Sequence, residues 1–260
     1  MWLFELFAQA VLFLAAISLV FIPLEYFWRA DKPEPGRVPW LRRAWFNDLV
    51  FYLGQILVFN AFTLFVLGFI FHRLGESALT PAILRELPTA LKIFLVILFS
   101  DFLIYWGHRA QHRFAFLWRF HRVHHTAEHV DYLAAYREHP FDNIYTRGIE
   151  TLPAIFFGLD LNTIAGFVTF RGLWALFIHS NTNIRLGFLE VLLGSPHLHH
   201  WHHELDKHGL CNYANLSPLM DLAFSTYYNP PERPEKYGTA EPVRQAWLWQ
   251  MIDPLLLWRR

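Results

Sequence analysis

Residues 91–125 read LKIFLVILFSDFLIYWGHRAQHRFAFLWRFHRVHH, an apolar run that passes directly into a block of histidines. The block has the spacing H-x3-H at His108 and His112, followed by H-x2-H-H from His121. Residues three or four apart lie on one face of a helix. We therefore predict helical faces that each present several imidazoles at the end of an apolar helix.

The same H-x2-H-H spacing recurs at His199, His202 and His203. Fifteen of the 260 residues are histidine, and eight of them belong to these three groups. Neutral imidazole is a good ligand for iron, zinc, copper and nickel, so the ligand type does not select the metal. Eight or more imidazoles exceed the roughly four to six ligands that one ion takes. The spacing therefore predicts a dinuclear metal site.

The composition is that of a membrane protein. Hydrophobic residues make up 54% of the chain, aromatic residues 18% and charged residues 17%, a balance that disfavours a soluble domain. The formal net charge is zero and the arginines are scattered, so we expect no nucleic acid partner. The single cysteine, Cys211, excludes an internal disulfide and a cysteine-based metal cluster, and it is expected to be a packed small residue.

Three apolar runs, residues 2–22, 49–71 and 91–106, are long enough to span a bilayer as helices. The first ends at Pro23 and an aromatic edge, with no cleavage site, so we expect it to stay in the mature chain. Residues 29–43 collect basic residues and prolines, which predicts a loop and, by the positive-inside rule, a cytoplasmic one. The third run then returns the chain to the cytoplasm with its histidines.

A fourth apolar region, residues 151–178, is interrupted near Gly158, Asp160 and Asn162. It predicts two shorter helices in a hairpin that dips into the bilayer and returns His179 to the other histidines. The polar residues 113–150 are expected to belong to a cap. The predicted fold class is all-α: a multi-pass membrane helical bundle with about three spans and a re-entrant hairpin, covered by a cytoplasmic histidine-rich helical cap.

The order of these motifs resembles the fatty acid hydroxylase and sterol desaturase superfamily of integral-membrane di-iron enzymes, in its broad bacterial form. The resemblance runs from about residue 95 to 230 and rests on Asp101, the H-x3-H pair, Arg137-x-His139-Pro140, His179-Ser180-Asn181, the two H-x2-H-H motifs and Asn212-Tyr213. Two features depart from the family pattern: Ala214 stands where a glycine is common, and the extra His197 and His200 crowd the last motif.

The resemblance implies that nine histidines bind two iron ions. They are His108, His112, His121, His124, His125, His179, His199, His202 and His203. His139, His200 and Asp101 are further candidates, either as ligands or as groups that orient a ligand. Asp101 precedes His108 by two helical turns, so it lies on the same face and can accept the outer ring N–H of a ligand. We expect His72, His129 and His208 to be structural or solvated.

Oxidation of an unactivated C–H bond requires a redox metal. The resemblance implies that the enzyme uses O2 to hydroxylate or desaturate a membrane lipid, and the sequence does not separate the two outcomes. The sequence has no visible haem domain, flavin fold or cysteine cluster, so a separate electron-transfer protein is expected to supply electrons. We expect an integral protein of the inner or cell membrane, with its active site facing the cytoplasm.

The predicted organisation is one membrane-integrated unit over residues 1–260. It comprises N-terminal transmembrane helices in 1–94, a fatty acid hydroxylase-like di-iron domain in 95–230 and a C-terminal tail in 231–260. The alternative function is a histidine-rich membrane metal-binding or transport protein without oxygenase activity. A transporter is disfavoured because its ionisable residues would lie within the spans, and a zinc protease is disfavoured because the chain has no H-E-x-x-H motif.

Overall fold

The computed structural model describes residues 2–31, 42–74, 80–205 and 210–256. Regular structure in these ranges is helical, apart from two isolated β-bridges, and the predicted all-α class is confirmed. Four helical segments are long and apolar enough to cross a membrane. They are α1 (Trp2–Phe27), the continuous series α2 (Trp45–Gly54), η1 (Gln55–Phe59) and α3 (Asn60–Leu74), then α6 (Thr89–Arg113) and α9 (Leu161–His179). The chain is therefore an integral membrane protein.

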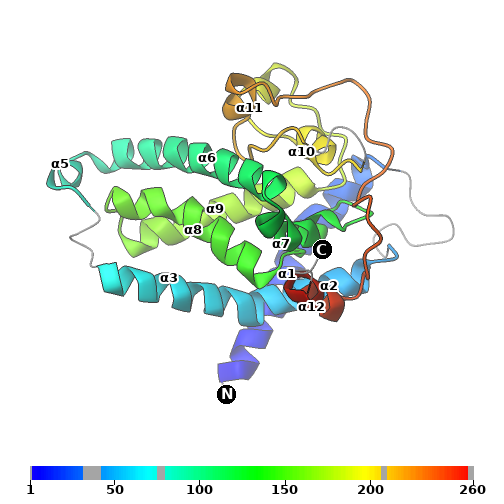
Figure 1. Ribbon diagram of the computed structural model, residues 1–260, viewed down its shortest axis with the longest axis horizontal. Coiled ribbons are helices and arrows are strands. Elements are labelled where there is room, and N and C mark those ends of the chain that lie inside the picture. The colour runs from blue at the N-terminus through cyan, green and yellow to red at the C-terminus, as the bar shows by residue number, and fades with distance from the viewer. Residues whose placement is uncertain (1, 32–41, 75–79, 206–209, 257–260) are drawn as a thin grey trace.

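The long helices form a bundle in which α6 and α3 lie on opposite sides of α8 and α9 (Figure 1). The short α5 lies at one end of the bundle, and α7, α10 and α12 gather toward the other end (Figure 1). The remaining elements are α5 (Ala82–Arg85), α7 (Ala115–His125), η2 (Ala134–Tyr136), α8 (Pro140–Phe156), η3 (Gly187–Val191), α10 (Pro196–His202), α11 (Leu219–Ala223) and α12 (Trp247–Leu256).

The outer faces of the long helices are apolar. Leu19, Leu64, Phe65 and Phe94 are each more than three-fifths exposed, with exposed fractions of 77%, 72%, 70% and 62%. Large apolar side chains that stand free along helices of this length are typical of a surface that faces lipid. The apolar exposure therefore supports membrane insertion independently of helix length.

Two apolar clusters hold the bundle together. One joins α1 to α2 and to the segment before η2, through Ala10, Tyr52 and Tyr132. The other lies between α6 and α8. At Gly107 on α6 an added Cβ would lie 2.2 Å from the Ile149 side chain on α8, so this glycine permits the close approach of the two helices. That approach fixes the end of α6, where two of the predicted ligands lie.

One end of the bundle collects the termini of all four span-length segments. The chain just after α1 bonds to the chain just after α9, since Ala30 N donates to the carbonyl of Asn181 at 3.2 Å. The beginning of α2 is bound to α12, since Trp247 N donates to the side chain of Asn47 at 2.8 Å. The alternating direction of the spans agrees with the predicted topology, in which the histidine motifs share one side.

The predicted hairpin over residues 151–178 consists of two helices, with its break where the sequence indicates it, but its second helix, α9, is itself long and apolar enough to cross a membrane. The chain turns between α8 and α9 at Gly158, whose φ is +65°, and Asp160 caps α9 by accepting from the backbone N–H groups of Asn162 and Thr163. The first helix begins earlier than expected, at Pro140. Residues 140–150 therefore belong to α8 and not to the predicted cap. Helix α8 turns Asp142, Asn143 and Glu150 inward, where they are buried.

Part of the predicted basic loop is a buried ion-pair site. Residues 32–41 lie outside the described ranges, but Arg42 is buried and its guanidinium donates to both carboxylate oxygens of Asp131, at 2.5 and 2.6 Å. Asp48 pairs with Arg42 and also with Arg137. Arg42, at the end of the predicted loop, is thus buried, because carboxylates from distant parts of the chain surround it. The first helix also continues beyond Pro23 to Phe27.

Candidate metal centre

Nine histidines converge in two neighbouring groups at the end of the bundle that carries α7 and α10. The first group is His108, His112, His121, His125 and His202, and the second is His124, His179, His199 and His203. Within each group, one ligand atom per residue lies within 4.8 Å of all the others. These nine residues are the ones predicted from the sequence, and the structure brings all of them together. Their role as ligands stays a prediction.

Local structure places the ligand-bearing helices. Helix α6 carries His108 and His112 one turn apart and ends at Arg113; the extended backbone of Phe114, with φ −102° and ψ 117°, then starts α7. The turn sets α7 against α6, so that the Nε2 atoms of His108 and His121 lie 3.0 Å apart. Helix α10 begins at Pro196 after Ser195, whose hydroxyl caps it by accepting from Leu198 N. A proline at the first position and a serine cap are standard helix-start signals.

Each H-x2-H-H motif contributes to both groups. The α7 motif gives His121 and His125 to the first group and His124 to the second, whereas the α10 motif gives His199 and His203 to the second and His202 to the first. The ring centroids of His125 and His203, from different groups, are 4.5 Å apart. The two groups are therefore adjacent parts of one site.

Backbone carbonyls hold the outer nitrogens of four rings. Nδ1 of His108 lies 2.7 Å from the Tyr213 carbonyl oxygen, and Nδ1 of His124 lies 3.1 Å from the Arg137 carbonyl oxygen. Nδ1 of His179 lies 2.7 Å from the Ala175 carbonyl oxygen, and Nδ1 of His202 lies 2.8 Å from the Cys211 carbonyl oxygen. A carbonyl oxygen only accepts, so each Nδ1 carries the proton and each Nε2 presents a lone pair. Cys211 is buried as predicted.

A carboxylate holds a fifth ring. Asp142 on α8 accepts from His121 Nδ1 at 3.1 Å and from the side-chain amide of Gln111 at 2.6 Å. Burial raises the pKa of Asp142 to about 7, while the hydrogen bond from Gln111 opposes the rise. Asp142 was not among the site residues predicted from the sequence. Its position three residues after His139, at the start of a helix, is the only sequence feature that pointed to it. A carboxylate behind a metal-binding imidazole fixes its orientation and raises its basicity.

The nitrogen contacts test whether a cation fits. Nε2 of His179 lies 3.0 Å from Nε2 of both His124 and His199. The first pair has both Nδ1 atoms protonated, so two lone pairs face each other, which is repulsive unless a cation lies between them. Nε2 of His112, of His125 and of His202 is buried without a hydrogen-bond partner in the described part of the chain, which is rare for a polar atom. The donor set therefore fits bound metal.

Protonation does not remove the lone-pair contacts. Burial lowers the pKa of His121 to about 3 and lowers the pKa values of His124, His125 and His202 well below their ordinary value. Desolvation is the largest cause in each case, because burial disfavours the charged imidazolium. The rings are therefore neutral at physiological pH, which is the form that binds metal.

The further candidates lie outside both groups. His139 caps α8, with Nδ1 accepting from Phe141 N and Nε2 3.2 Å from the Met251 carbonyl. His200 is buried behind a predicted ligand: its Nε2 lies 3.3 Å from the His179 carbonyl, and its Nδ1 lies 3.1 Å from the Tyr237 hydroxyl. The structure thus gives His139 a capping role and His200 an orienting position. His197 is also buried, with Nε2 2.8 Å from the Pro230 carbonyl.

The expectation that Asp101 accepts from a ligand is wrong. Asp101 pairs with Arg171 on α9, and His108 uses the Tyr213 carbonyl instead. Seven residues return a side chain to the same helical face, but they also separate it by about 10 Å along the axis, which is beyond the reach of a carboxylate. His129 lies outside both groups, His208 lies outside the described residues, and so does the side chain of His72.

Comparison with known proteins agrees with this geometry. The family model described as Fatty acid hydroxylase matches residues 93–226, a range that contains all nine histidines of the two groups. The chain belongs to the fatty acid hydroxylase family. No solved structure gives a significant match to this family member.

Several curated proteins are similar to this family member. The ornithine lipid hydroxylase OlsE of Rhizobium tropici is 28% identical over 170 residues, which cover 64% of the chain and 51% of the relative. The human alkylglycerol monooxygenase is 31% identical over 144 residues, covering 55% of the chain and 32% of the relative. The Delta(7)-sterol 5(6)-desaturase erg31 of Schizosaccharomyces pombe is 29% identical over 142 residues, covering 53% and 44%. The chain thus spans about half, or less, of these relatives.

Proposed function

We propose that this fatty acid hydroxylase family member is an O2-dependent oxidoreductase that hydroxylates or desaturates a C–H bond of a membrane lipid at a di-iron centre. The observation that carries the proposal is the convergence of nine imidazoles in two groups at one end of an apolar helical bundle. The relatives are a lipid hydroxylase, an alkylglycerol monooxygenase and a sterol desaturase, which supports lipid as the substrate class.

The two groups would each hold one iron ion, with five imidazoles available to the first and four to the second. Bound iron would supply the activation of O2 that no protein side chain can provide. The protein contributes the fixed ring orientations: carbonyls hold His108, His124, His179 and His202 from behind, and Asp142 holds His121. Rings locked in this way do not have to reorganise when metal binds.

The overall reaction requires an electron source. Hydroxylation places one oxygen atom of O2 in the C–H bond and reduces the other to water, which consumes two further electrons and two protons. Desaturation removes two hydrogen atoms from the lipid and reduces both oxygen atoms to water, with the same demand. We propose that a separate electron-transfer protein supplies these electrons.

The site is proposed to face the cytoplasm, in the inner or cell membrane. Arg29, Arg42 and Arg43 flank the connection between the first two spans, and they lie at the bundle end that carries the histidines, as the positive-inside rule requires for a cytoplasmic side. We also propose that the chain comprises N-terminal transmembrane helices in residues 1–94, a di-iron domain in 95–230 and a C-terminal tail in 231–260.

Metal analysis of the purified protein tests the di-iron centre. We expect two iron ions per chain and no haem absorption, with loss of iron in His124→Ala and in His202→Ala. His72→Ala is the matched control, because α3 ends at the opposite end of the bundle, near α5 (Figure 1), and its iron content should equal that of the parent chain. Zinc in place of iron would favour the alternative of a metal-binding protein without oxygenase activity.

Comparative lipid mass spectrometry tests the reaction. Cells with the gene should contain a lipid that has gained one oxygen atom, or lost two hydrogen atoms, relative to cells without it. The change should disappear in the same two histidine variants and persist in His72→Ala. An unchanged lipid profile in cells that contain the iron-loaded protein would count against lipid oxidation.

A further inference from the structure

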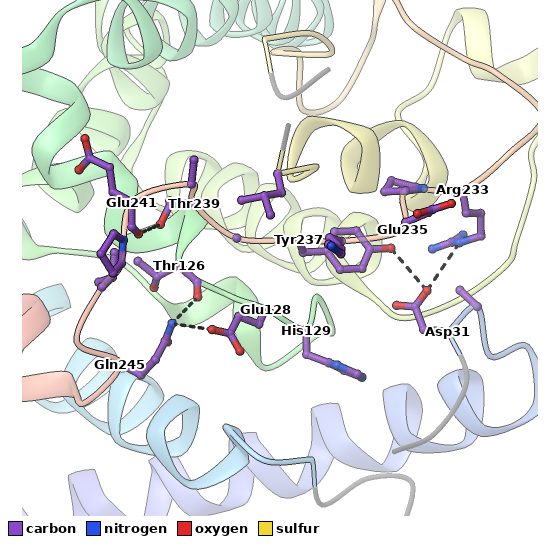
Figure 2. Close-up of a pocket in the computed structure, with 18 residues that line it drawn as sticks. Asp31, Thr126, Glu128, His129, Arg233, Glu235, Tyr237, Thr239, Glu241 and Gln245 are labelled. Carbon is purple, nitrogen blue, oxygen red and sulfur yellow. Dashed lines mark hydrogen bonds and ion pairs between the residues drawn. The ribbon is translucent and has the colours of Figure 1, made fainter. Parts of the chain in front are cut away.

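A large polar cavity lies outside both histidine groups. Its volume is about 1190 Å³. Four segments line it: the residues after α1, the residues after α7, Leu205 after α10, and the stretch 233–245 that leads to α12. Figure 2 shows Asp31, Arg233 and Tyr237 pointing toward one another at one end, with Gln245 and Glu128 at the other. The mechanism proposed above uses none of these residues.

At one end of the cavity, a carboxylate and a guanidinium each have an atom without a hydrogen-bond partner among the described residues. Arg233 Nε lies 3.9 Å from Asp31 Oδ1, too far for a hydrogen bond, and the Tyr237 hydroxyl donates to the same oxygen at 3.5 Å. Asp31 Oδ2 and Arg233 Nε are both buried without a hydrogen-bond partner among the described residues. Burial raises the pKa of Asp31 although Arg233 opposes it, as expected for a carboxylate short of partners. The other two guanidinium nitrogens of Arg233 already donate, to His200 Nδ1 at 2.6 Å and to the Thr182 carbonyl at 3.3 Å. A ligand with an N–H donor for Asp31 Oδ2 and an anionic acceptor for Arg233 Nε would satisfy both atoms.

The charge of the whole lining favours a cation. The carboxylates are those of Asp31, Glu128, Glu235 and Glu241, and the fixed cations are Arg233 and Lys236. Glu241 is paired with Arg122 at 3.0 Å, which leaves three carboxylates against two cations. Excess negative charge around a partly enclosed space attracts a positively charged group. An ammonium group with an anion nearby therefore fits this cavity better than an anion alone.

A second cavity adjoins this polar space at the start of α2. It has a volume of about 820 Å³ and shares Glu128, His129 and Gln245 with the first. Its other lining residues include Phe46 and Val50 of α2, and α2 begins the second span-length segment. The second cavity has a mixed lining, since Arg43, Asn47 and Arg137 also line it. Its apolar side chains at the start of a membrane helix can receive the part of an amphiphile next to its headgroup.

The polar cavity also lies directly behind the metal centre. Tyr237 on its wall contacts His200 Nδ1 at 3.1 Å, and His200 Nε2 contacts the carbonyl of His179 at 3.3 Å. Thr126, another wall residue, follows His125 in the chain. A group bound in this cavity is thus separated from the predicted ligands by a single layer of side chains.

We propose that the polar cavity binds the headgroup of the lipid substrate, and that this headgroup carries a primary ammonium and an anionic group. Asp31 accepts from the ammonium, and Arg233 donates to the anion. That the bound lipid is the substrate rests on the proposed function of the metal centre. Binding of such a headgroup in this cavity does not depend on that function.

Lipid retention by the full-length protein tests the site. The purified protein is mixed with equal amounts of phosphatidylethanolamine and phosphatidylglycerol of the same acyl chains, and the bound lipid is measured by native mass spectrometry. One charge-assisted hydrogen bond corresponds to about a tenfold preference, so we expect about tenfold more phosphatidylethanolamine. Asp31→Asn, which keeps the shape, should bring the ratio toward one. Arg233→Gln should lower the retention of both lipids and leave their ratio unchanged, because both carry the phosphate to which Arg233 would donate. Glu86→Gln and Lys92→Gln, at the other end of the bundle, should leave it unchanged.

Equal retention of the two lipids, or a preference that survives in Asp31→Asn, would overturn the proposal. If Arg233→Gln does not fold, the isosteric Asp31→Asn decides alone. Retention is measured without turnover, so its failure leaves the iron assignment intact, and loss of iron in a histidine variant leaves retention intact. If the bound lipid is the substrate, Asp31→Asn also raises KM for an aminolipid while the iron content stays at that of the parent chain.

Discussion

Removal of the carboxylate behind His121 is expected to weaken iron binding without removing a ligand. Asp142 is buried and accepts from His121 Nδ1 at 3.1 Å and from Gln111 at 2.6 Å. Asp142→Leu removes the only described acceptor for the His121 ring N–H, so the ring loses its orientation and part of its basicity. Loss of such a partner lowers metal affinity about 10- to 100-fold.

A graded pair of substitutions separates charge from geometry. Asp142→Asn keeps one acceptor oxygen, which can face His121, but loses the charge and replaces the oxygen that accepts from Gln111 with an NH2 group. Its effect should lie near the lower limit, about tenfold. Asp142→Leu should lie near the upper limit, about a hundredfold. Asp160→Asn is the matched control, because Asp160 is an exposed helix cap with no contact to a histidine and asparagine caps helices equally well.

The assay is retention of iron against increasing concentrations of a competing chelator, with thermal unfolding as a check that each variant is folded. The expected order of affinity is parent chain and Asp160→Asn, then Asp142→Asn, then Asp142→Leu. A folded Asp142→Leu protein that retains iron as tightly as the parent chain would refute the role assigned to this carboxylate.

Two further substitutions test the packing that positions the site. An added Cβ at Gly194 would lie 2.4 Å from the backbone oxygen of Asn215, so Gly194→Ala should destabilise the protein by about 1–3 kcal/mol. Gly172→Ala is the control and should not destabilise it, because an added Cβ there has nothing within 4 Å. Thermal unfolding of the two variants measures the difference. Arg137→Met leaves the buried Asp48 without one partner, which should cost about 3–5 kcal/mol and appear as a lower unfolding midpoint in denaturant; an unchanged midpoint would contradict the assigned ion pair.

Much of the fold was predictable because its signals are local. Apolar runs of span length gave the membrane helices, and Gly158 with Asp160 marked the break of the hairpin, since a positive φ and a helix cap require such residues. Arg42 was not predictable in the same way. Its burial depends on Asp48 and Asp131, and no local pattern distinguishes it from a solvated loop arginine.

The predicted ligands were recognisable because their chemistry resides in side chains at fixed spacing. The groups that hold them were not, since the partners of His108, His124 and His202 are backbone carbonyls outside the helices that carry these histidines. Every residue has a carbonyl, so the sequence carries no mark of which one is used. Asp101 shows the complementary error: its spacing indicated the correct helical face, but face alone does not specify position along the axis.

The division of each H-x2-H-H motif between two groups follows from helix geometry. At about 100° per residue, the fourth position after the first histidine returns to within roughly 40° of it, whereas the third lies about 60° away on the other side. The i and i+4 rings therefore converge on one centre, and the i+3 ring turns toward its neighbour, as His121, His125 and His124 do. Substitution of an i+3 histidine should consequently affect one centre first. We expect His124→Ala to lose the iron of the four-histidine group while the five-histidine group keeps its full set of imidazoles, and His202→Ala to do the reverse. Equal loss of both ions in both variants would mean that the two groups bind metal only as a unit.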